Sequence, residues 1–475
     1  MSKHFGWRLT SKLRDEIYKY AKYQPTGVSL RQMVQFGPKP SEGSLFHASR
    51  FVVEELPIRL AHRVKELEEL PNELNKDPSI ELVRDWYAQS FDELISIPKP
   101  EIDEELKNLL YKNVNESGNS SHSSISKPNN HIIFEDDGVI VPRRRYTHSH
   151  STDSSHHLHG SGGSGGFHPL DPDFSSSKKY YIPCSKNLNY PPEIVDYNRL
   201  VTETLTKIKK RHDATVPTIA KGVQNWKKIV NASFVDNNMQ SFLDRFYMSR
   251  IGIRMLIGQQ IAISHQYKSS SFNNYNDDYV GIICLHTNVS EIAQDAIDSA
   301  RFTCEEHYGL FEAPKVQLYC PEDLNFMYVP GHLVHMLFET LKNSLRATVE
   351  NQMRLNPDKD IDDLEFPPIK IIIAEGEEDI TIKISDEGGG IPRSAIPLIW
   401  TYLYTTVDDL PNSESSGIAK SDYRAPMAGY GYGLPISRLY ARYFGGDLKL
   451  ISMEGYGTDV YLHLNRLSSS SEPLQ

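Results

Sequence analysis

One sixteen-residue segment, His335 to Glu350 (HMLFETLKNSLRATVE), constrains this chain more than any other stretch. It has the pattern of an amphipathic helix, with leucine and methionine side chains spaced to form an apolar side. His335, Glu339 and Asn343 recur at intervals of four residues, so a helix places all three on one face. A carboxylate and an amide directed at the same place indicate an ion pair or a ligand site. A solvated face that repeats by chance is the simpler alternative.

Length and composition describe a globular protein. The 475 residues are enough for two or three domains with a large buried core. The balance of 51 Lys and Arg against 62 Asp and Glu gives a net charge of −11, which argues against a general nucleic-acid-binding role. No apolar run approaches the roughly 18 to 20 residues that a membrane helix needs, so we expect no transmembrane segment.

The cysteines and the first residues bear on the compartment. No CxxC pair occurs among Cys184, Cys284, Cys304 and Cys320. Neither a zinc site nor a disulfide framework is therefore indicated, and a reducing compartment fits best. The first fourteen residues are basic and contain no acid, so residues 1–28 resemble a short mitochondrial targeting leader, although a folded helix could equally begin there.

The N-terminal half has the pattern of a helical bundle. Helical periodicity covers residues 45–70, with a kink or restart at Pro57, and continues over 78–96, 191–211 and 238–263. Four long helices are the number required for an antiparallel four-helix bundle, which we assign to residues 29–263.

A polar insert interrupts this bundle at about residues 115–177. The stretch is rich in Ser, Gly, Asn and His and cannot bury enough apolar surface to offset the entropy of ordering it. We therefore predict that the insert is disordered and loops out of the bundle. Its six histidines between His148 and His168 could capture a metal, but a flexible polar loop lacks fixed ligand geometry.

The C-terminal half has the pattern of a mixed domain. Strands are predicted at 279–285, 316–319, 369–373, 380–385, 448–453 and 460–464. Helices are predicted between them at 288–308, 330–356 and 435–443. This order predicts an α/β sandwich over residues 279–466, followed by a flexible tail at 467–475. The expected fold class is thus a two-domain α+β protein.

Three glycine-bearing segments follow the opening helix. In SDEGGGIP, Asp386 ends a predicted strand, where its carboxylate could accept a hydrogen bond from an exocyclic amine, although a tight loop with a capping Asp explains this motif equally well. The segment GYGYGLP, Gly429 to Pro435, leads into a helix whose N-terminus favours phosphate. It matches neither the P-loop nor the dinucleotide-binding fingerprint. In GYGTDVYL, Thr458 could donate a hydrogen bond to a purine edge.

The order of these motifs resembles the GHKL ATPase superfamily, which includes histidine kinases, Hsp90-type chaperones, MutL and type II topoisomerases. The resemblance implies the Bergerat α/β sandwich with an ATP site. Asn343 would coordinate Mg²⁺ and Asp386 would accept from the adenine amino group. Residues Tyr404 to Ala428 would form a mobile lid over the phosphates.

Within this superfamily the chain is similar to the mitochondrial pyruvate dehydrogenase kinases. The similarity lies in long runs, including SLRQMVQFG, RFVVEELPIRLAHRVKELEELP, SIELVRDWYAQS, RHDATVPTIAKGV, FLDRFYMSRIGIRMLI, HMLFETLKNSLRATVE and ARYFGGDLKLISMEGYGTDVYL. The branched-chain α-keto acid dehydrogenase kinases share this architecture, but FLDRFYMSRI and ARYFGGDL look closer to the pyruvate group.

This second resemblance implies roles for individual residues. Glu339 would be the general base for a substrate serine, with His335 orienting it, and Asn343 would hold Mg²⁺. His212 would have a structural or substrate-orienting role. The residues implied around the nucleotide are Glu339, Thr340, Leu341, Lys342, Asn343, Ser344, Leu345, Arg346, Asp386, Gly388, Gly390, Thr405, Thr406, Gly429, Tyr430, Gly431, Tyr432, Gly433, Leu434 and Thr458.

The resemblance also implies cofactors and partners. ATP and Mg²⁺ would be used, possible K⁺ dependence is a family trait, and the compartment would be the mitochondrial matrix. The implied partners are the E1α subunit of pyruvate dehydrogenase, which phosphorylation would inactivate, and the lipoyl domain of the E2 acetyltransferase. A homodimer, or a heterodimer with a paralogous kinase, is also implied. The chain departs from the family in its insert, in a longer lid and in a tail that lacks the Asp–Trp pair, so regulation through that pair is not carried over.

Other functions remain open at this stage. HDATVP, beginning at His212, matches the box in which sensor histidine kinases phosphorylate themselves, although no sensor or receiver module accompanies it. An ATP-driven clamp of the Hsp90 or MutL kind usually places its ATPase domain first, whereas here it comes last. A pseudokinase scaffold is disfavoured by the presence of Glu339, Asn343 and Asp386.

Overall fold

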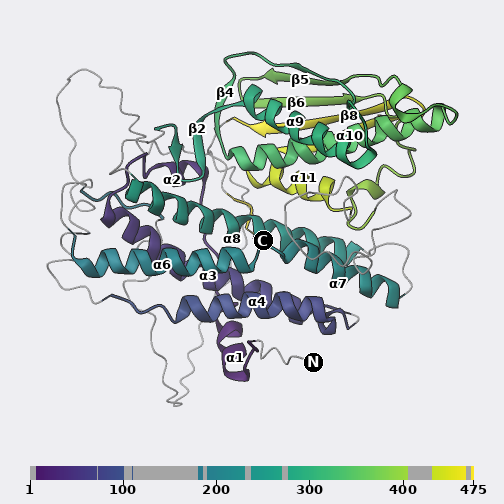
Figure 1. Cartoon of the computed structure of the whole chain (residues 1–475). Coiled ribbons are helices and arrows are strands. Elements are labelled where there is room, and N and C mark those ends of the chain that lie inside the picture. Colours follow the sequence, from purple (N-terminus) through teal and green to yellow (C-terminus); the bar gives the residue numbers. More distant parts are fainter. Residues whose placement is uncertain are drawn as a thin grey trace, which may run out of the picture. The chain divides into compact units, whose positions relative to one another are not determined.

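The computed structural model describes residues 7–71, 73–100, 110, 180–185, 190–230, 237–269, 277–404, 431–466 and 472–474 (Figure 1). All of them belong to one unit, formed by residues 1–111 and 179–475. The whole predicted insert, residues 405–428 of the expected lid and most of the tail lie outside the described residues. No helix among the described residues is long and apolar enough to cross a membrane.

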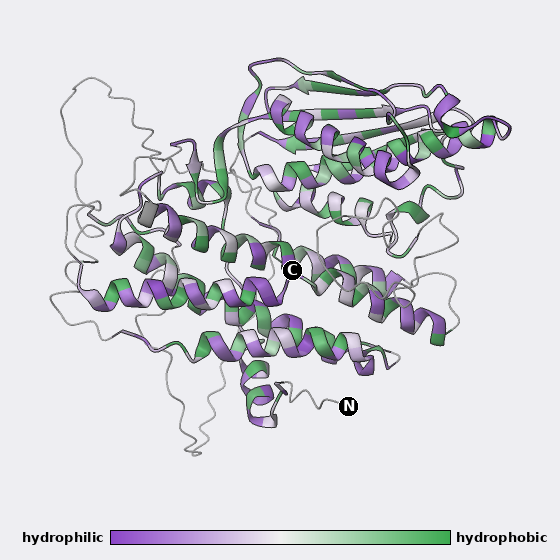
Figure 2. Cartoon of the chain, viewed as in Figure 1, coloured by the Kyte–Doolittle hydropathy of each residue, from purple (hydrophilic) through white to green (hydrophobic). Residues whose placement is uncertain are grey.

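The N-terminal half is helical, as predicted. Its elements are α1 (Ser11–Tyr20), α2 (Leu30–Val34), α3 (Glu42–Glu68), the 3-10 helix Leu74–Lys76, α4 (Pro78–Ile95), α6 (Pro192–Arg211), α7 (Thr215–Ile229) and α8 (Asn237–Ser269). The four long helices predicted from periodicity correspond to α3, α4, α6 and α8. The sequence reading missed α7, and α1 lies inside the segment interpreted as a leader. In Figure 2, α6 alternates hydrophilic and hydrophobic residues, which is typical of a helix with one side on a core.

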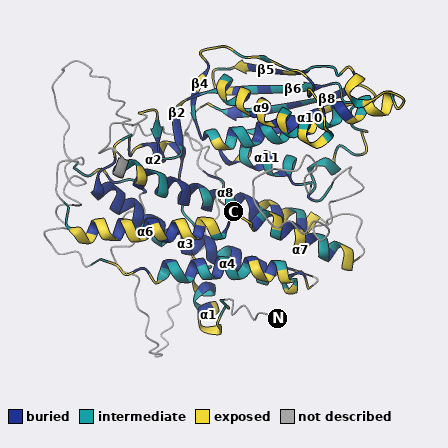
Figure 3. Cartoon of the chain, in the orientation of Figure 1, coloured by how far each residue is buried: buried dark blue, intermediate teal, exposed yellow. Residues whose placement is uncertain are grey.

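Helix α3 is the central helix of this half and contacts α1, α4, α6 and α8. It begins at Ser41, whose hydroxyl accepts from the N–H of Ser44 at 3.2 Å. Most of its residues are buried, as Figure 3 shows. The helix does not restart at Pro57, contrary to one of our expectations, but runs through it. A proline costs a helix one hydrogen bond, and burial on nearly all sides offsets that loss.

The C-terminal half combines two sheets with three long helices. The strands are β1 (Tyr279–Val280), β2 (Ile283–Asn288), β3 (Val316–Tyr319), β4 (Asn325–Tyr328), β5 (Ile369–Glu375), β6 (Asp379–Asp386), β7 (Asp447–Met453) and β8 (Gly457–Asn465). The helices are α9 (Val289–Tyr308), α10 (Pro330–Leu355) and α11 (Gly433–Tyr443), with short 3-10 turns at Ile361–Asp363 and Leu398–Trp400. The predicted helices and the five later strands are all present. The first predicted strand is split into β1 and β2, and β4 was missed.

The larger sheet has five strands in the order β3-β5-β6-β8-β7. Strands β3 and β5 are parallel, and the remaining neighbours are antiparallel. Helices α9, α10 and α11 pack on this sheet, and Figure 1 shows them on one of its sides. The smaller sheet has the order β1-β2-β4. Together with the helical half, this architecture is the expected α+β fold, in which α10 contacts α9, α11 and strand β6, and α11 contacts both the sheet and α8.

Candidate active site

Helix α10 contains the segment from which the sequence analysis began. Its Met336, Leu337, Leu341 and Leu345 are fully buried, so the predicted apolar side faces the core. On the other side, the Glu339 side chain is 15% exposed and Asn343 is exposed. Because the buried side anchors the helix, Glu339 and Asn343 lie one turn apart on the side that is not packed into the core. The polar face formed by His335, Glu339 and Asn343 is therefore neither a buried network nor a fully solvated face.

The carboxylate of Glu339 is held by a lysine of the same helix. The Nζ of Lys342 donates to Oε1 of Glu339 at 3.0 Å, and the Lys342 side chain is only 4% exposed. The ammonium also lies 5.4 Å from the centre of the Phe338 ring. A nearly buried ion pair of this kind fixes the direction of the carboxylate. Lys342 was expected near the nucleotide, but its pairing with Glu339 was not predicted, although the i,i+3 spacing of the two residues indicates it.

His335 precedes Glu339 by one turn, yet no hydrogen bond joins their side chains among the described contacts. The imidazole packs edge-on against Tyr440 of α11, with 4.9 Å between ring centres. Its Nε2 is buried and has no hydrogen-bond partner within the part of the chain that the structure describes. Burial lowers the pKa of His335, and the nearby Glu339 carboxylate opposes this effect. A neutral imidazole in this position carries no charge and can influence Glu339 only through its ring dipole, and no hydrogen bond between the two side chains is present among the described residues.

Asp386 lies at the end of β6 and is 6% exposed. Its carboxylate accepts from the hydroxyl of Ser344 at 2.8 Å and from the N–H of Gly388 at 3.0 Å. Burial raises the pKa of Asp386, whereas these hydrogen bonds favour the charged form. A carboxylate has about four acceptor positions. The side chain can therefore take a further hydrogen bond from an amine, as the sequence analysis expected.

Thr458 sits opposite Asp386 in the β6–β8 register. Its hydroxyl shares a hydrogen bond with the hydroxyl of Ser452 at 2.9 Å, and the residue is 9% exposed. Ser452 in turn accepts from the N–H of Ile391, just after the triple glycine. The predicted donor thus belongs to a hydroxyl pair that also positions the glycine loop. Ser452 itself was not recognised from the sequence.

Two glycines of the DEGGG segment allow the loop after β6 to pass close to neighbouring elements. Gly388 supplies the N–H that binds Asp386 and lies against Ala347 of α10, where a Cβ would come within 2.6 Å of the Ala347 Cβ. Gly390 has a φ of +70°, and a Cβ there would meet the Met453 carbonyl oxygen at 2.0 Å. The glycines therefore let the loop pass between α10 and the β7–β8 turn.

The second glycine segment starts α11 next to Glu339. Gly431 has a φ of +75° and lies against the backbone of Tyr404. Leu434 is partly buried against the core. Gly433 approaches Glu339 so closely that a Cβ on it would lie 2.4 Å from Oε2. The ring of Tyr432 is buried against Tyr402, with 5.1 Å between ring centres. Thr405, Thr406, Gly429 and Tyr430 lie outside the described residues.

Other residues of the predicted α10 set turn away from this side. Thr340, Leu341 and Leu345 are buried, and the Thr340 hydroxyl bonds to the Met336 carbonyl of its own helix at 2.8 Å. Arg346 is ion-paired with Glu350 through Nε and Oε1 at 2.7 Å. The structure brings Glu339, Lys342 and Gly433 into contact, and separately Ser344, Asp386, Gly388 and Thr458. Asn343 is exposed on the same helix, whereas the side chains of Thr340, Leu341 and Leu345 belong to the core.

His212 lies in the helical half, at the C-terminal end of α6. It is 1% exposed, its ring stacks on Tyr87 at 4.4 Å, and its Nε2 is 3.0 Å from the Ser90 hydroxyl. Burial lowers the pKa of His212 to about 3. A phosphate-accepting histidine must present a nitrogen to ATP, and this enclosed ring does not. The placement favours the structural role over autophosphorylation.

Comparison with known proteins identifies related families for both halves of the chain. Residues 27–284 match the family model for mitochondrial branched-chain alpha-ketoacid dehydrogenase kinase. Residues 328–468 match the model for histidine kinase-, DNA gyrase B- and HSP90-like ATPases. Each model thus covers one half of the fold.

Similar proteins extend over nearly the whole chain. The mitochondrial [pyruvate dehydrogenase (acetyl-transferring)] kinase of Schizosaccharomyces pombe is 41% identical, over 98% of this chain and 99% of its own. The Arabidopsis thaliana protein of the same name is 38% identical, over 97% and 96%. Human isozyme 4 is 32% identical, over 96% of this chain and 85% of its own. The chain therefore belongs to the mitochondrial α-ketoacid dehydrogenase kinase family, in which its similar relatives are pyruvate dehydrogenase kinases.

Proposed function

We propose that this protein is a mitochondrial matrix serine kinase that uses ATP and Mg²⁺ to phosphorylate, and so inactivate, the E1α subunit of pyruvate dehydrogenase. One observation carries the proposal: Glu339 is presented one turn from Asn343 and against Gly433, in a chain similar to pyruvate dehydrogenase kinases over nearly its full length. A base beside a metal-binding amide and a glycine-rich helix start suits phosphoryl transfer, which depends on positioning and charge neutralisation.

Asp386 and Thr458 would recognise the adenine through hydrogen bonds. The Asp386 carboxylate keeps acceptor positions beyond those used by Ser344 and Gly388, so it can accept from the exocyclic amine. The Thr458 hydroxyl on the adjacent strand can donate to a ring nitrogen. The start of α11 at Gly433 offers free N–H groups toward phosphate.

The residues present fit a magnesium ion bound mainly through the nucleotide. Asn343 is exposed and offers an amide oxygen, a ligand that Mg²⁺ accepts together with phosphates and water. Among the described residues, no cluster of three or more His, Cys, Asp or Glu side chains forms a separate metal cage. When bound, the ion would neutralise charge on the transferring phosphoryl group. K⁺ dependence is part of the same proposal.

Glu339 would accept the proton of the substrate serine. The Lys342 ammonium fixes the carboxylate through Oε1 and leaves Oε2 on the side of Gly433. The half-buried His335 ring, neutral because burial lowers its pKa, would orient Glu339 through its ring dipole from one turn away. The proton would pass to Glu339 as the serine oxygen bonds to the γ-phosphorus and the bond to the β,γ-bridging oxygen breaks, so that ADP would be the leaving group.

The partners complete the proposal. We infer docking on the lipoyl domain of the E2 acetyltransferase and a dimer, either of two identical chains or with a paralogous kinase. The side of the five-stranded sheet away from the helices supports a dimer, because Ile372, Ile451 and Met453 are each more than 40% exposed there. Sedimentation of the purified protein should give the mass of a dimer, and Ile451→Asp should shift it toward the monomer.

A direct assay tests the proposed function. The purified chain is incubated with ATP, Mg²⁺ and recombinant E1 of either the pyruvate or the branched-chain complex, and phosphoserine is measured. Labelling of pyruvate dehydrogenase E1α with loss of its activity is expected. Labelling of the branched-chain E1 alone would assign the chain to that alternative, which the matching family model makes the second candidate. Acid-labile phosphate on the kinase itself would instead support a histidine autokinase.

A further inference from the structure

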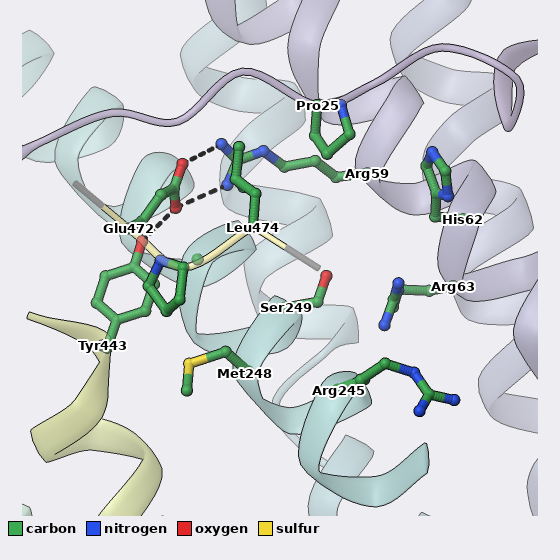
Figure 4. A pocket seen from close by; sticks show the side chains of 12 residues that line it. Pro25, Arg59, His62, Arg63, Arg245, Met248, Ser249, Tyr443, Glu472 and Leu474 are labelled. Atoms are coloured by element: carbon green, nitrogen blue, oxygen red, sulfur yellow. Dashed lines mark hydrogen bonds and ion pairs between the residues drawn. The ribbon is translucent and has the colours of Figure 1, made fainter. Parts of the chain in front are cut away.

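The end of the chain inserts a carboxylate into the helical half. Glu472 is 6% exposed, although the composition of the tail around it predicts a flexible segment. It lies at a cavity lined by residues from α3, α8 and α11, together with Pro25 and the tail itself (Figure 4). A buried charge is unfavourable unless it is fully paired, so its partners determine whether this contact is specific.

The Glu472 carboxylate has four donors. Arg59 of α3 binds it with two nitrogens, Nη1 to Oε2 at 3.0 Å and Nη2 to Oε1, as Figure 4 shows. The N–H of Val28 donates to Oε1 at 3.1 Å. The hydroxyl of Tyr443, the last residue of α11, donates to Oε2 at 2.5 Å. Four donors match the acceptor capacity of a carboxylate, which makes this a complete carboxylate-binding site.

Arg59 depends on this carboxylate for its charge balance. The Arg59 side chain is 4% exposed, and its remaining nitrogen, Nε, donates to Glu55 at 2.9 Å. Burial alone would lower the pKa of Arg59, but the charges of Glu472 and Glu55 outweigh burial and raise it. The space is also tight, because a Cβ on Gly252 of α8 would lie 3.0 Å from Oε2 of Glu472. The buried guanidinium and the tight space therefore suit a small, negatively charged group such as a carboxylate.

Helix α11 links this carboxylate to the active site. Its last residue, Tyr443, is bound to Glu472, and its first, Gly433, lies against Glu339. A helix of eleven residues is about 16 Å long and transmits a displacement of one end to the other. The hydrogen bond at Tyr443 therefore influences the position of the glycine-rich N-terminal end of α11.

We propose that Glu472 is a positioning residue for the nucleotide site, and that the pocket around Arg59 is a carboxylate-binding site occupied by the chain's own tail. Glu472 binds the Tyr443 hydroxyl and so fixes the C-terminal end of α11. The position of α11 in turn sets the distance between the glycine-rich segment at its N-terminal end and Glu339. This inference rests on the ATP site of the proposed function. Wild-type protein that does not bind ATP would refute that function itself.

The test measures ATP binding by calorimetry on the full-length chain, with the melting temperature recorded in parallel. Glu472→Ala is expected to weaken ATP binding by at least about fivefold, the lower range of coupling between linked sites. Added acetate should restore the affinity by filling the vacated site, and neutral acetamide should not. Glu322→Gln, at an exposed position, serves as the control and should match wild type.

Three outcomes would overturn the inference. Wild-type ATP affinity in Glu472→Ala would do so, even with a lower melting temperature, because that pattern describes a purely structural contact. Weakened binding that acetate does not restore would remove the carboxylate site. Should Glu472→Ala fail to fold, Tyr443→Phe decides the question, since it deletes only the hydroxyl that joins tail and helix. Tyr443→Phe should weaken ATP binding, and unchanged affinity in this variant would refute the positioning role.

Discussion

Gly433 lies directly against the carboxylate of Glu339, so that a Cβ on residue 433 would come within 2.4 Å of Oε2. The two residues are 94 positions apart in the chain, one on α10 and the other at the start of α11. The contact brings the glycine-rich segment to the side chain proposed as the general base. It explains the glycine at this position by a close approach and not by a special backbone angle.

Gly433→Ala should therefore impair transfer more than folding. The added methyl group displaces the Glu339 carboxylate, which is the movable end of a flexible side chain. We expect kcat for E1α phosphorylation to fall about 10- to 100-fold, with a small change in melting temperature. Gly331→Ala is the matched control, because a Cβ on Gly331 of α10 meets nothing within 4 Å. A Gly433→Ala protein with wild-type kcat would show that the contact does not matter for catalysis.

Glu339→Gln should separate chemistry from binding. The amide keeps the size of the side chain and can still accept from Lys342, but it cannot take up a proton. The expected loss in kcat is about 10²- to 10⁴-fold, with ATP affinity close to wild type. Single-turnover phosphorylation and calorimetry measure the two quantities. Full transfer by Glu339→Gln would exclude Glu339 as the base.

Asp386→Asn should weaken ATP binding. The substitution removes the charged acceptor proposed for the adenine amine and sets an amide among the donors Ser344 and Gly388. A hydrogen bond to a charged group contributes roughly 1.5–3 kcal/mol, so we expect affinity to fall about 10- to 100-fold. The exposed Asp323→Asn is the control. If both variants bind ATP equally well, Asp386 does not contact the base.

Buried histidines make stability depend on pH, and His212 gives a specific case. Its pKa is lowered from 6.5 to about 3 in the folded protein, so between these values the unfolded chain binds more protons. The His212 contribution to the free energy of unfolding is then largest above pH 6.5 and falls as the pH drops toward 3. The His212 contribution should fall by up to about 2 kcal/mol between pH 6.5 and about pH 5.

Denaturant unfolding at several pH values checks this. His212→Gln should flatten the pH dependence of the free energy of unfolding by that amount, whereas the exposed His286→Gln should leave it unchanged. An equal slope in wild type and His212→Gln would mean that the buried imidazole does not resist protonation.

The sequence predicted how several residues of the candidate site lie within their own helix or strand, because such placement depends on neighbouring residues in the chain. The four-residue spacing of His335, Glu339 and Asn343 places them on one side of a helix whatever surrounds it. Apolar residues at the complementary positions predict which side is buried, and α10 follows that prediction. Asp386 at the end of a strand, followed by glycines, is likewise a local pattern. Recognition of the family followed from long runs of such patterns.

The tertiary structure decided which residues from different elements meet. Glu472 and Arg59 are 413 positions apart, and nothing in a serine-rich tail indicates a buried carboxylate. Ser452 acquires its role only through the β7–β8 turn beside the glycine loop, and β4 is a strand because β2 offers it a partner. Helix and strand periodicity is a property of neighbouring residues in the chain. Contacts between elements depend on how whole layers pack, and for that reason the sequence determined the face of α10 but not what lies against it.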